Sequence, residues 1–463
     1  MPQVPAIPVI PPADLAAFAT GFDGAVVAPD DPAYDAARRV ANSAIDRRPA
    51  VIVRPAGKAG VARAVAFARD AGLPLAVRGG GHSAAGHGVA DGGLVIDMAA
   101  MKAIEVDPHR RVATAEGGVL AGEYVKATFA HGLTTPLGDT STVGLGGLTL
   151  GGGAGWLARK HGLTIDSLLA AELVTADGRV VRVSEDEEPD LFWAIRGGGG
   201  NFGVVTRFEF GLQPIGTVLG GALVLPGTRE VLRSHLPIAA SAPDEMSTIA
   251  MLMAIPRLPF VPAGHHGTLA MLVMVVHAGE LEAGHAALAP YRAVATPLGE
   301  AVAPMPYPAI FEIGGPGGPM ASVTRSMFLP ALDDAAVDTI LDFMARRSAP
   351  GALVQLRVLG GAVGRVPAEA TAYAFRDRPL MLTVIVPFPD PAEADVHREW
   401  ADALSGALRP AATGVYSNFL EDEGPARVRE AYPGLTYHRL ESVKRRFDPS
   451  NVFRVNHNIP PAT

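Results

Sequence analysis

The sequence predicts an α+β protein with two domains. Its 463 residues are more than one ordinary hydrophobic core accommodates. Strand-like and helix-like segments alternate with short connections up to about Gly211. Beyond that point the strands become longer and richer in Met, Leu and Val, with long helices between them. We therefore expect the second part to form one antiparallel sheet with helices on a single face.

The first part opens with an amphipathic helix over residues 59–71, where apolar residues recur on one face. An Asp177-Gly178 turn later predicts a β-hairpin with strands over 170–175 and 179–183. The other elements expected in this part are strands over 73–77, 94–97, 103–106, 112–115 and 203–210, and a helix over 119–131.

In the second part, apolar runs bounded by turn residues predict strands, and longer amphipathic stretches predict helices. The strands are expected over 219–225, 246–255, 268–276, 354–359 and 380–387. The helices are expected over about 229–240, 280–293, 332–347 and 391–408. The Gly/Pro-rich stretch Ile313–Met320 is expected to be a loop inside this part.

Composition excludes several classes of protein. A hydrophobic content of 48% with 19% charged residues is typical of a globular chain, and a net charge of −8 argues against a nucleic-acid-binding surface. We expect the short basic run Lys444-Arg445-Arg446 to be a solvated helix face. The absence of cysteine excludes disulfides, thiolate metal sites, cysteine nucleophiles and cysteinyl cofactor links.

The sequence carries no targeting, membrane or metal signature. The first 20 residues lack a basic region and are interrupted by prolines, which is not the pattern of a signal peptide. No window approaches 18 uninterrupted apolar residues, so we expect a soluble cytoplasmic protein, monomeric or homodimeric. Because no His-Glu-x-x-His occurs, no metal is expected, and neither a Gly-x-Ser-x-Gly elbow nor a Walker A motif is present.

The segment Val77-Arg78-Gly79-Gly80-Gly81-His82-Ser83 is the first candidate binding loop. Consecutive glycines leave backbone N–H groups unobstructed and allow positive φ, so the loop can fold around a pyrophosphate. Arg78 would add positive charge, and His82 offers a nucleophilic imidazole beside the ligand. A glycine-rich turn with an incidental histidine is the alternative, and this segment alone does not separate the two.

Two further glycine-rich stretches follow. Residues 140–155 combine the hydroxyls of Thr140, Ser141 and Thr142 with seven glycines, which suits a second phosphate-binding loop. Residues 196–205 formally match a dinucleotide fingerprint, but a helix precedes them and a strand follows. A Rossmann turn has the opposite order, so we reject that interpretation.

These motifs, taken in order, resemble a known family. Arg-Gly-Gly-Gly-His (78–82), the glycine loop at 146–153, Asp190 to Val205, and the C-terminal segments 439–453 and 456–461 are similar to berberine-bridge-enzyme-like FAD-linked oxidases. The resemblance implies a two-domain vanillyl-alcohol-oxidase or PCMH-type FAD-binding fold. It divides the chain into an FAD-binding part over 1–212, a substrate-binding domain over 213–413, and a segment over 414–463 that returns to the FAD-binding part.

The resemblance also assigns the cofactor contacts. His82 aligns with the histidine that bonds to the 8α-methyl carbon of FAD. The cysteine that forms a second bond in many relatives would fall at Thr140, so His82 is expected to be the only covalent anchor. The residues expected to contact FAD are Arg78, Gly79, Gly80, Gly81, His82, Ser83, Thr140, Ser141, Val143, Gly144, Gly147, Gly151, Gly152, Gly203, Val205, Asn456 and Asn458.

The catalytic residues are expected on two segments. Tyr416-Ser417-Asn418 resembles the family's Tyr-x-Asn strand, whose tyrosine can act as the base. A phenol needs a nearby cation to ionise near neutral pH. Gln355 and Arg357 are two positions apart on one strand and therefore share a face, so Arg357 is a candidate for that cation. The alternatives are that Tyr416 only packs at the domain junction and that Arg357 pairs with a surface acid.

The expected activity is oxidation of a C–H bond next to oxygen or nitrogen in a small molecule, with O₂ reduced to H₂O₂. Val143 falls where the family gates oxygen access, and a valine there resembles the oxidases, although it also suits a core position. A dehydrogenase with another electron acceptor, or a flavin-binding protein without turnover, are the alternatives.

Overall fold

The computed structural model describes residues 10–313 and 318–462. Near the N-terminus, a four-stranded sheet packs against helix α3 (Lys58–Asp70). Val61, Val65 and Ala68 of this helix are fully buried, as its amphipathic pattern predicts. The strand order in the sheet is β1 (Gly24–Val27), β2 (Val51–Pro55), β4 (Leu94–Asp97) and β3 (Leu75–Arg78).

A second sheet of five strands follows in the chain, and every pair in it is antiparallel. The helices in the same stretch of the chain are α4 (Ala121–Phe129), α5 (Leu145–Gly151), α6 (Ala158–His161) and α7 (Pro189–Ile195). The strand order is β5 (Ile104–Asp107), β6 (Val112–Glu116), β10 (Val204–Gly211), β8 (Leu168–Val174) and β9 (Val180–Ser184). Helix α7 precedes the glycine stretch and strand β10 follows it, which confirms that this is not a Rossmann turn.

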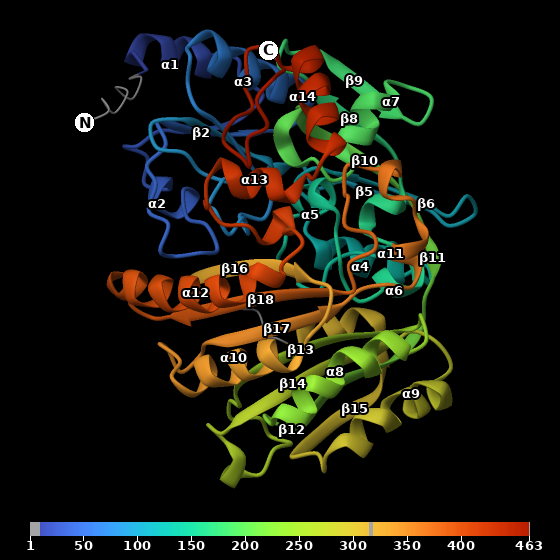
Figure 1. The fold of residues 1–463 in the computed structure, drawn as a ribbon. Helices are drawn as coiled ribbons and strands as arrows, with labels where there is room; N and C mark the ends of the chain where they lie inside the picture. The colour runs from blue at the N-terminus through green and yellow to red at the C-terminus, as the bar shows by residue number, and fades with distance from the viewer. Residues whose placement is uncertain (1–9, 314–317, 463) are drawn as a thin grey trace.

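The third sheet is antiparallel and has seven strands. Their order is β15 (Gly299–Pro306), β12 (Thr217–Pro226), β14 (Leu269–His277), β13 (Met246–Ala254), β17 (Leu353–Val358), β18 (Leu380–Phe388) and β16 (Ala321–Leu329). Helices α8 (Arg229–Ser241), α9 (Leu281–Val294), α10 (Asp334–Ala345) and α12 (Ala394–Leu408) cover one face (Figure 1). The opposite face joins the core of the five-stranded sheet through Val218, Ile249 and Val276.

The C-terminal segment returns to the first two sheets, as the red ribbon beside the green and blue elements shows (Figure 1). Helix α14 (Leu435–Phe447) packs on α7, and α13 (Pro425–Ala431) precedes it. Short elements complete the described fold: α1 (Pro12–Ala19), α2 (Tyr34–Ala37), α11 (Ala362–Arg365), and the paired strands β7 (Leu133–Thr134) and β11 (Gln213–Pro214).

The interpretation of the basic run as a solvated helix face is wrong for Lys444. Its side chain is fully buried and its ammonium forms a 2.6 Å ion pair with Asp448, which is also fully buried. The ammonium also donates to the carbonyls of Asn201 and Phe453, both at 2.8 Å. The carboxylate of Asp448 accepts the backbone N–H groups of Val452 and Phe453. This pair therefore ties the C-terminal segment to the glycine stretch near Asn201.

The helices and strands predicted over 59–211 and 219–408 are present, with ends within a few residues. The sequence did not predict β15 and β16, where prolines in the first and polar residues in the second break the expected apolar run. Other elements missed from the sequence are β1, β2, β7, β11, α1, α2, α5, α6, α11 and α13. Of the predicted loop at 313–320, residues 314–317 lie outside the described residues. Among the helices of the described residues, none combines the length and apolar character that a membrane crossing requires.

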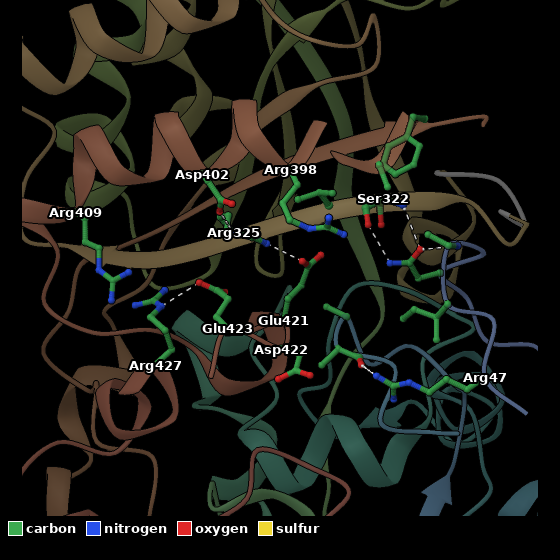
Figure 2. A pocket seen from close by; sticks show the side chains of 18 residues that line it. Arg47, Ser322, Arg325, Arg398, Asp402, Arg409, Glu421, Asp422, Glu423 and Arg427 are labelled. Carbon is green, nitrogen blue, oxygen red and sulfur yellow. Dashed lines mark hydrogen bonds and ion pairs between the residues drawn. The ribbon is translucent and has the colours of Figure 1, made fainter. Parts of the chain in front are cut away.

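A polar cavity of about 470 Å³ lies where the first sheet, the seven-stranded sheet and the C-terminal segment meet (Figure 2). Ion pairs span it: Arg325 contacts Asp402 and Glu421, each at 2.6 Å. Beside it, the Asn42 side chain forms two hydrogen bonds with the backbone of Ser322. The Arg325 pairs thus join β16 to α12 and to the C-terminal segment, and the Asn42 contacts join it to an N-terminal loop.

We expect Lys444→Met to lower the free energy of unfolding by about 3–5 kcal/mol, because it leaves the Asp448 carboxylate buried without its cation. Denaturant unfolding of the flavin-loaded protein measures this change. Arg445→Met on the same helix is the control, since its exposed side chain is expected to cost no more than about 0.5 kcal/mol. Equal stability of the two variants would contradict the role given to Lys444.

Candidate functional site

Two of the predicted glycine loops meet backbone to backbone. The loop of Gly79, Gly80 and Gly81 follows β3, and the loop of Thr142 and Gly144 precedes α5. A Cβ atom at Gly80 would lie 2.3 Å from the Gly144 nitrogen, and one at Gly144 would lie 2.2 Å from the Gly80 nitrogen. Both positions therefore require glycine. Gly81 has φ +71°, which also favours glycine.

His82 has an exposed side chain, yet the chain packed around it desolvates the ring and lowers the pKa of the imidazole. The ring is therefore neutral at pH 7 and has a nitrogen lone pair available. The Ser83 hydroxyl accepts the N–H of His87 at 3.3 Å, and the His87 ring meets the His457 ring edge-on at 4.7 Å. The His82 loop is thus tied to the C-terminal segment.

The C-terminal segment places two asparagines beside these loops. The Asn456 amide donates to the carbonyls of Gly200 and Phe453. Among the described residues, the Oδ1 atoms of Asn456 and Asn458 are buried and accept no hydrogen bond. Buried acceptors without donors are rare, so these two oxygens fit a bound group that carries N–H or O–H donors.

The other residues of the second loop differ in exposure. Thr140 and Gly147 are exposed, and a Cβ atom at Gly147 would meet nothing within 4 Å. Ser141 packs against Gly122 of α4, and Val143 packs against the core of the five-stranded sheet. Open space beside Gly147 suits a loop that borders a ligand, whereas Ser141 and Val143 also have packing partners within the protein.

The expectation that Arg78 supplies charge for a phosphate is not supported. Its guanidinium is buried and pairs with Asp97 at 2.7 Å, and Asp97 also pairs with Arg54 at 2.7 Å. Burial alone would raise the pKa of Asp97, but hydrogen bonds and charge from the two arginines hold it below its ordinary value. The charge of Arg78 is therefore compensated inside the protein.

Gly203 and Val205 lie at the start of β10. A Cβ atom at Gly203 would lie 2.7 Å from the side chain of Leu173 and from the carbonyl of Val174. Val205 is buried, and its carbonyl lies close to Gly117. Packing within the sheet thus accounts for glycine at position 203, and cofactor contact by either residue stays a prediction.

Tyr416 is buried, and its phenol oxygen accepts two hydrogen bonds. The Gly153 N–H donates at 2.9 Å and the Asn418 amide at 3.0 Å. Burial raises the pKa of Tyr416, while these donors and the charge of Arg357 act in the opposite direction. A phenol oxygen with this many donors is arranged to stabilise a phenolate.

Tyr416 and Asn418 contact the end of the second glycine loop directly. A Cβ atom at Gly151 would lie 2.1 Å from the Asn418 Oδ1, and one at Gly152 would lie 3.4 Å from the Tyr416 ring. The expected strand is wrong here: Tyr416 precedes a short 3₁₀ helix over Ser417–Phe419. No neighbouring strand pairs with these residues, and the turn brings the two side chains together.

Gln355 and Arg357 share a face of β17, as predicted, and the Arg357 Nε donates to the Gln355 Oε1 at 2.8 Å. Arg357 also forms an ion pair with Asp139, and its guanidinium lies 5.2 Å from the centre of the Phe419 ring. It forms no hydrogen bond with Tyr416 in the described structure, so it acts on the phenol through its charge alone.

Three residues of this centre were missed from the sequence. Asp139 directly precedes Thr140, but nothing in the sequence pairs it with Arg357, which lies more than 200 positions away. Tyr373 and Phe419 both meet the Tyr416 ring edge-on, at 5.9 Å and 5.2 Å. The Tyr373 contact joins two segments far apart in sequence, and the Phe419 contact depends on the 3₁₀ turn that replaced the expected strand.

The assembled features fit a flavin dinucleotide. Two glycine loops meet, an exposed imidazole lies on one of them, and, in the part of the chain that the structure describes, two buried asparagine oxygens lack donors. No group of three or more His, Cys, Asp or Glu side chains in the described residues is arranged to bind a metal ion. The buried phenol at the end of the second loop adds a group that can hold or release a proton.

Comparison with known proteins gives the same result. Residues 49–184 match the FAD binding domain family, and residues 415–460 match the family described as berberine and berberine like. The chain is 33% identical over 453 residues to (R)-6-hydroxynicotine oxidase of Paenarthrobacter nicotinovorans, covering 95% of this chain and 97% of the relative.

Two solved structures are similar over almost their whole length. The 6-hydroxy-D-nicotine oxidase of Arthrobacter nicotinovorans has a TM-score of 0.85 at 30% identity and covers 95% of this chain and 98% of its own. Glucooligosaccharide oxidase of Acremonium strictum, described with a 6-S-cysteinyl, 8α-N1-histidyl FAD, has a TM-score of 0.85 at 25% identity, covering 97% and 99%. This chain is an FAD-binding enzyme with the two-domain PCMH-type fold, and it belongs to the berberine-bridge-enzyme-like FAD-linked oxidoreductases.

Proposed function

We propose that the chain is an oxidase that takes a hydride from a C–H bond next to oxygen or nitrogen in an alcohol, sugar or amine, and reduces O₂ to H₂O₂. The single observation that carries the proposal is the buried Tyr416 phenol, held by backbone and amide donors at the end of a flavin-binding loop. FAD, when bound, supplies the hydride acceptor and the route of electrons to O₂. Relatives named as oxidases of hydroxynicotine and of oligosaccharides support this reaction class.

In this proposal, Tyr416 accepts the proton from the substrate O–H or N–H. The donors from Gly153 and Asn418 stabilise the phenolate form, which carries the negative charge before it takes up the proton. Arg357 adds positive charge, and Gln355 holds its guanidinium in place. These four side chains, Tyr416, Asn418, Arg357 and Gln355, form the proposed catalytic centre.

We further propose that His82 carries FAD through one covalent bond to the 8α-methyl carbon. The neutral, exposed imidazole supports this assignment, and the absence of cysteine leaves no residue for a second bond. Residues 1–212 and 414–463 would form the FAD-binding part and residues 213–413 the substrate-binding domain. The seven-stranded sheet, which lies within residues 213–413, supports this division.

Tyr416→Phe is expected to slow anaerobic flavin reduction by about 10²–10⁴-fold without loss of bound FAD, because it removes the proposed base. In the unchanged protein the rate should rise with pH, since burial raises the pKa of Tyr416 and the phenolate is the reactive form. Stopped-flow reduction by a substrate from a peroxide-coupled screen measures both. Tyr437→Phe on α14 is the control and should reduce its flavin at the unchanged rate. An unaltered rate in Tyr416→Phe would refute the assignment of Tyr416 as the base.

His82→Ala is expected to bind FAD only non-covalently. Acid precipitation of the unchanged protein should give a yellow pellet, and the same treatment of the variant should leave the pellet colourless and the flavin in solution. His109→Ala, in an exposed turn, is the control and should behave like the unchanged protein. A colourless pellet from the unchanged protein would contradict the covalent assignment.

Mixing the reduced enzyme with air separates an oxidase from a dehydrogenase. We expect the flavin to be reoxidised within seconds and to yield one H₂O₂ for each flavin reoxidised. The reason is that Val143 is smaller than the residues that dehydrogenases of the family have at this position. Absorbance of the oxidised flavin follows the reaction. Reoxidation that takes minutes would exclude the oxidase and favour a different electron acceptor.

A further inference from the structure

A small cavity of about 20 Å³ lies behind the loop that holds Tyr416. Residues of the loop after Gly153 line one side, and residues of β13 and β17 line the other. Ala154, which lines the cavity, directly follows Gly153, whose N–H donates to the Tyr416 phenol. The lining includes two arginines, Arg159 and Arg357, and none of its residues is acidic.

Arg159 is buried, with 5% of its surface exposed. Its guanidinium donates to the carbonyls of Leu359 at 2.7 Å and Ala242 at 2.8 Å. In residues 10–313 and 318–462 it has no carboxylate within ion-pair distance, and its Nε–H finds no acceptor. Burial lowers the pKa of Arg159, although the charge of Asp244 acts in the opposite direction. A buried cation without a counter-charge is costly.

Trp156 presents a second unused donor on the same cavity. Its side chain is 4% exposed, and its indole N–H is buried without an acceptor among the described residues. The hydroxyl-bearing residues Ser247 and Thr248 line the opposite wall. Arg357 differs from Arg159, because Asp139 already compensates its charge. The residues that line the cavity therefore combine two unused N–H donors with a positive charge that, among the described residues, has no ion-pair partner.

We propose that this cavity binds a compact anion, a halide or one carboxylate group, through the Nε–H of Arg159 and the indole N–H of Trp156. Its volume exceeds the ~10–15 Å³ that one water molecule needs, which leaves space for one small ion or one carboxylate group. An anion accepts hydrogen bonds from every donor and neutralises Arg159, whereas a water molecule must also find acceptors for its own hydrogens. The site does not depend on the proposed oxidase reaction.

Bromide is the probe, because its anomalous X-ray scattering locates it directly. Crystals of the flavin-loaded protein soaked in bromide are expected to show an anomalous peak in this cavity, within hydrogen-bond distance of the Arg159 Nε and the Trp156 Nε1. A peak-free cavity that refines as water, or bromide found only elsewhere on the surface, would overturn the proposal.

A thermal titration tests the same site in solution. Bromide, chloride and formate are expected to raise the Tm saturably by about 2–4 °C over sodium gluconate at equal ionic strength, because gluconate is too large for the cavity. Trp156→Phe should raise the half-saturating bromide concentration at least about tenfold, since it removes one hydrogen bond to a charge. Arg159→Met should abolish the effect where it folds.

Trp400→Phe is the matched control. Its indole N–H is also buried without a partner in the described residues, but it lies on α12, away from the cavity. It should titrate like the unchanged protein. If Trp156→Phe also titrates like the unchanged protein, the assignment of the site is wrong.

Steady-state kinetics then identifies the source of the anion. Bromide that raises KM without changing kcat marks the cavity as a subsite for a substrate carboxylate. Saturable bromide binding with an unchanged KM marks it as a site for a free inorganic anion.

Discussion

The contact between two glycine loops is the constraint on which the rest of the site depends. The backbones of Gly80 and Gly144 approach so closely that neither position has space for a Cβ atom. The first loop extends β3 of the four-stranded sheet, and the second leads through α5 to Gly153, whose N–H holds the Tyr416 phenol. A contact between two backbones therefore sets the distance between the histidine loop and the phenol, although no side chain joins them.

Three buried cationic side chains are each paired with a nearby carboxylate, whereas Arg159 has no such partner in the described part of the chain. Arg78, Arg357 and Lys444 are buried, and each has its own buried or nearly buried carboxylate. Tyr416 relies instead on neutral N–H donors, which allow it to change charge without a permanent counter-ion. Arg159 has neither arrangement, since backbone carbonyls are its acceptors. The buried cations that have a carboxylate partner thus maintain the fold, whereas Tyr416 and Arg159 remain available to a ligand.

Local sequence patterns predicted most of the longer helices and strands, because hydrophobic periodicity and turn residues depend on neighbours in the chain. The glycine loops, the position of His82 at the end of the first loop and the shared face of Gln355 and Arg357 follow from such patterns. The pairing of Asp139 with Arg357 and the burial of Lys444 do not, because each depends on segments far apart in sequence. Lys444 stands beside two exposed arginines, and it differs from them through its ion pair with Asp448 and its hydrogen bond to the distant Asn201 carbonyl. Prediction failed where the burial of a charge depends on segments that only the tertiary fold brings together.

The anchoring of the C-terminal segment has a consequence for biosynthesis. The loop around His82 leaves the ribosome early, whereas Asn456 and Asn458 emerge only after most of the chain has been made. Until Lys444 and Asp448 have docked at Asn201, one wall beside the loops is missing. The wall that the C-terminal segment forms beside these loops is therefore the last part of this region to be synthesised and folded.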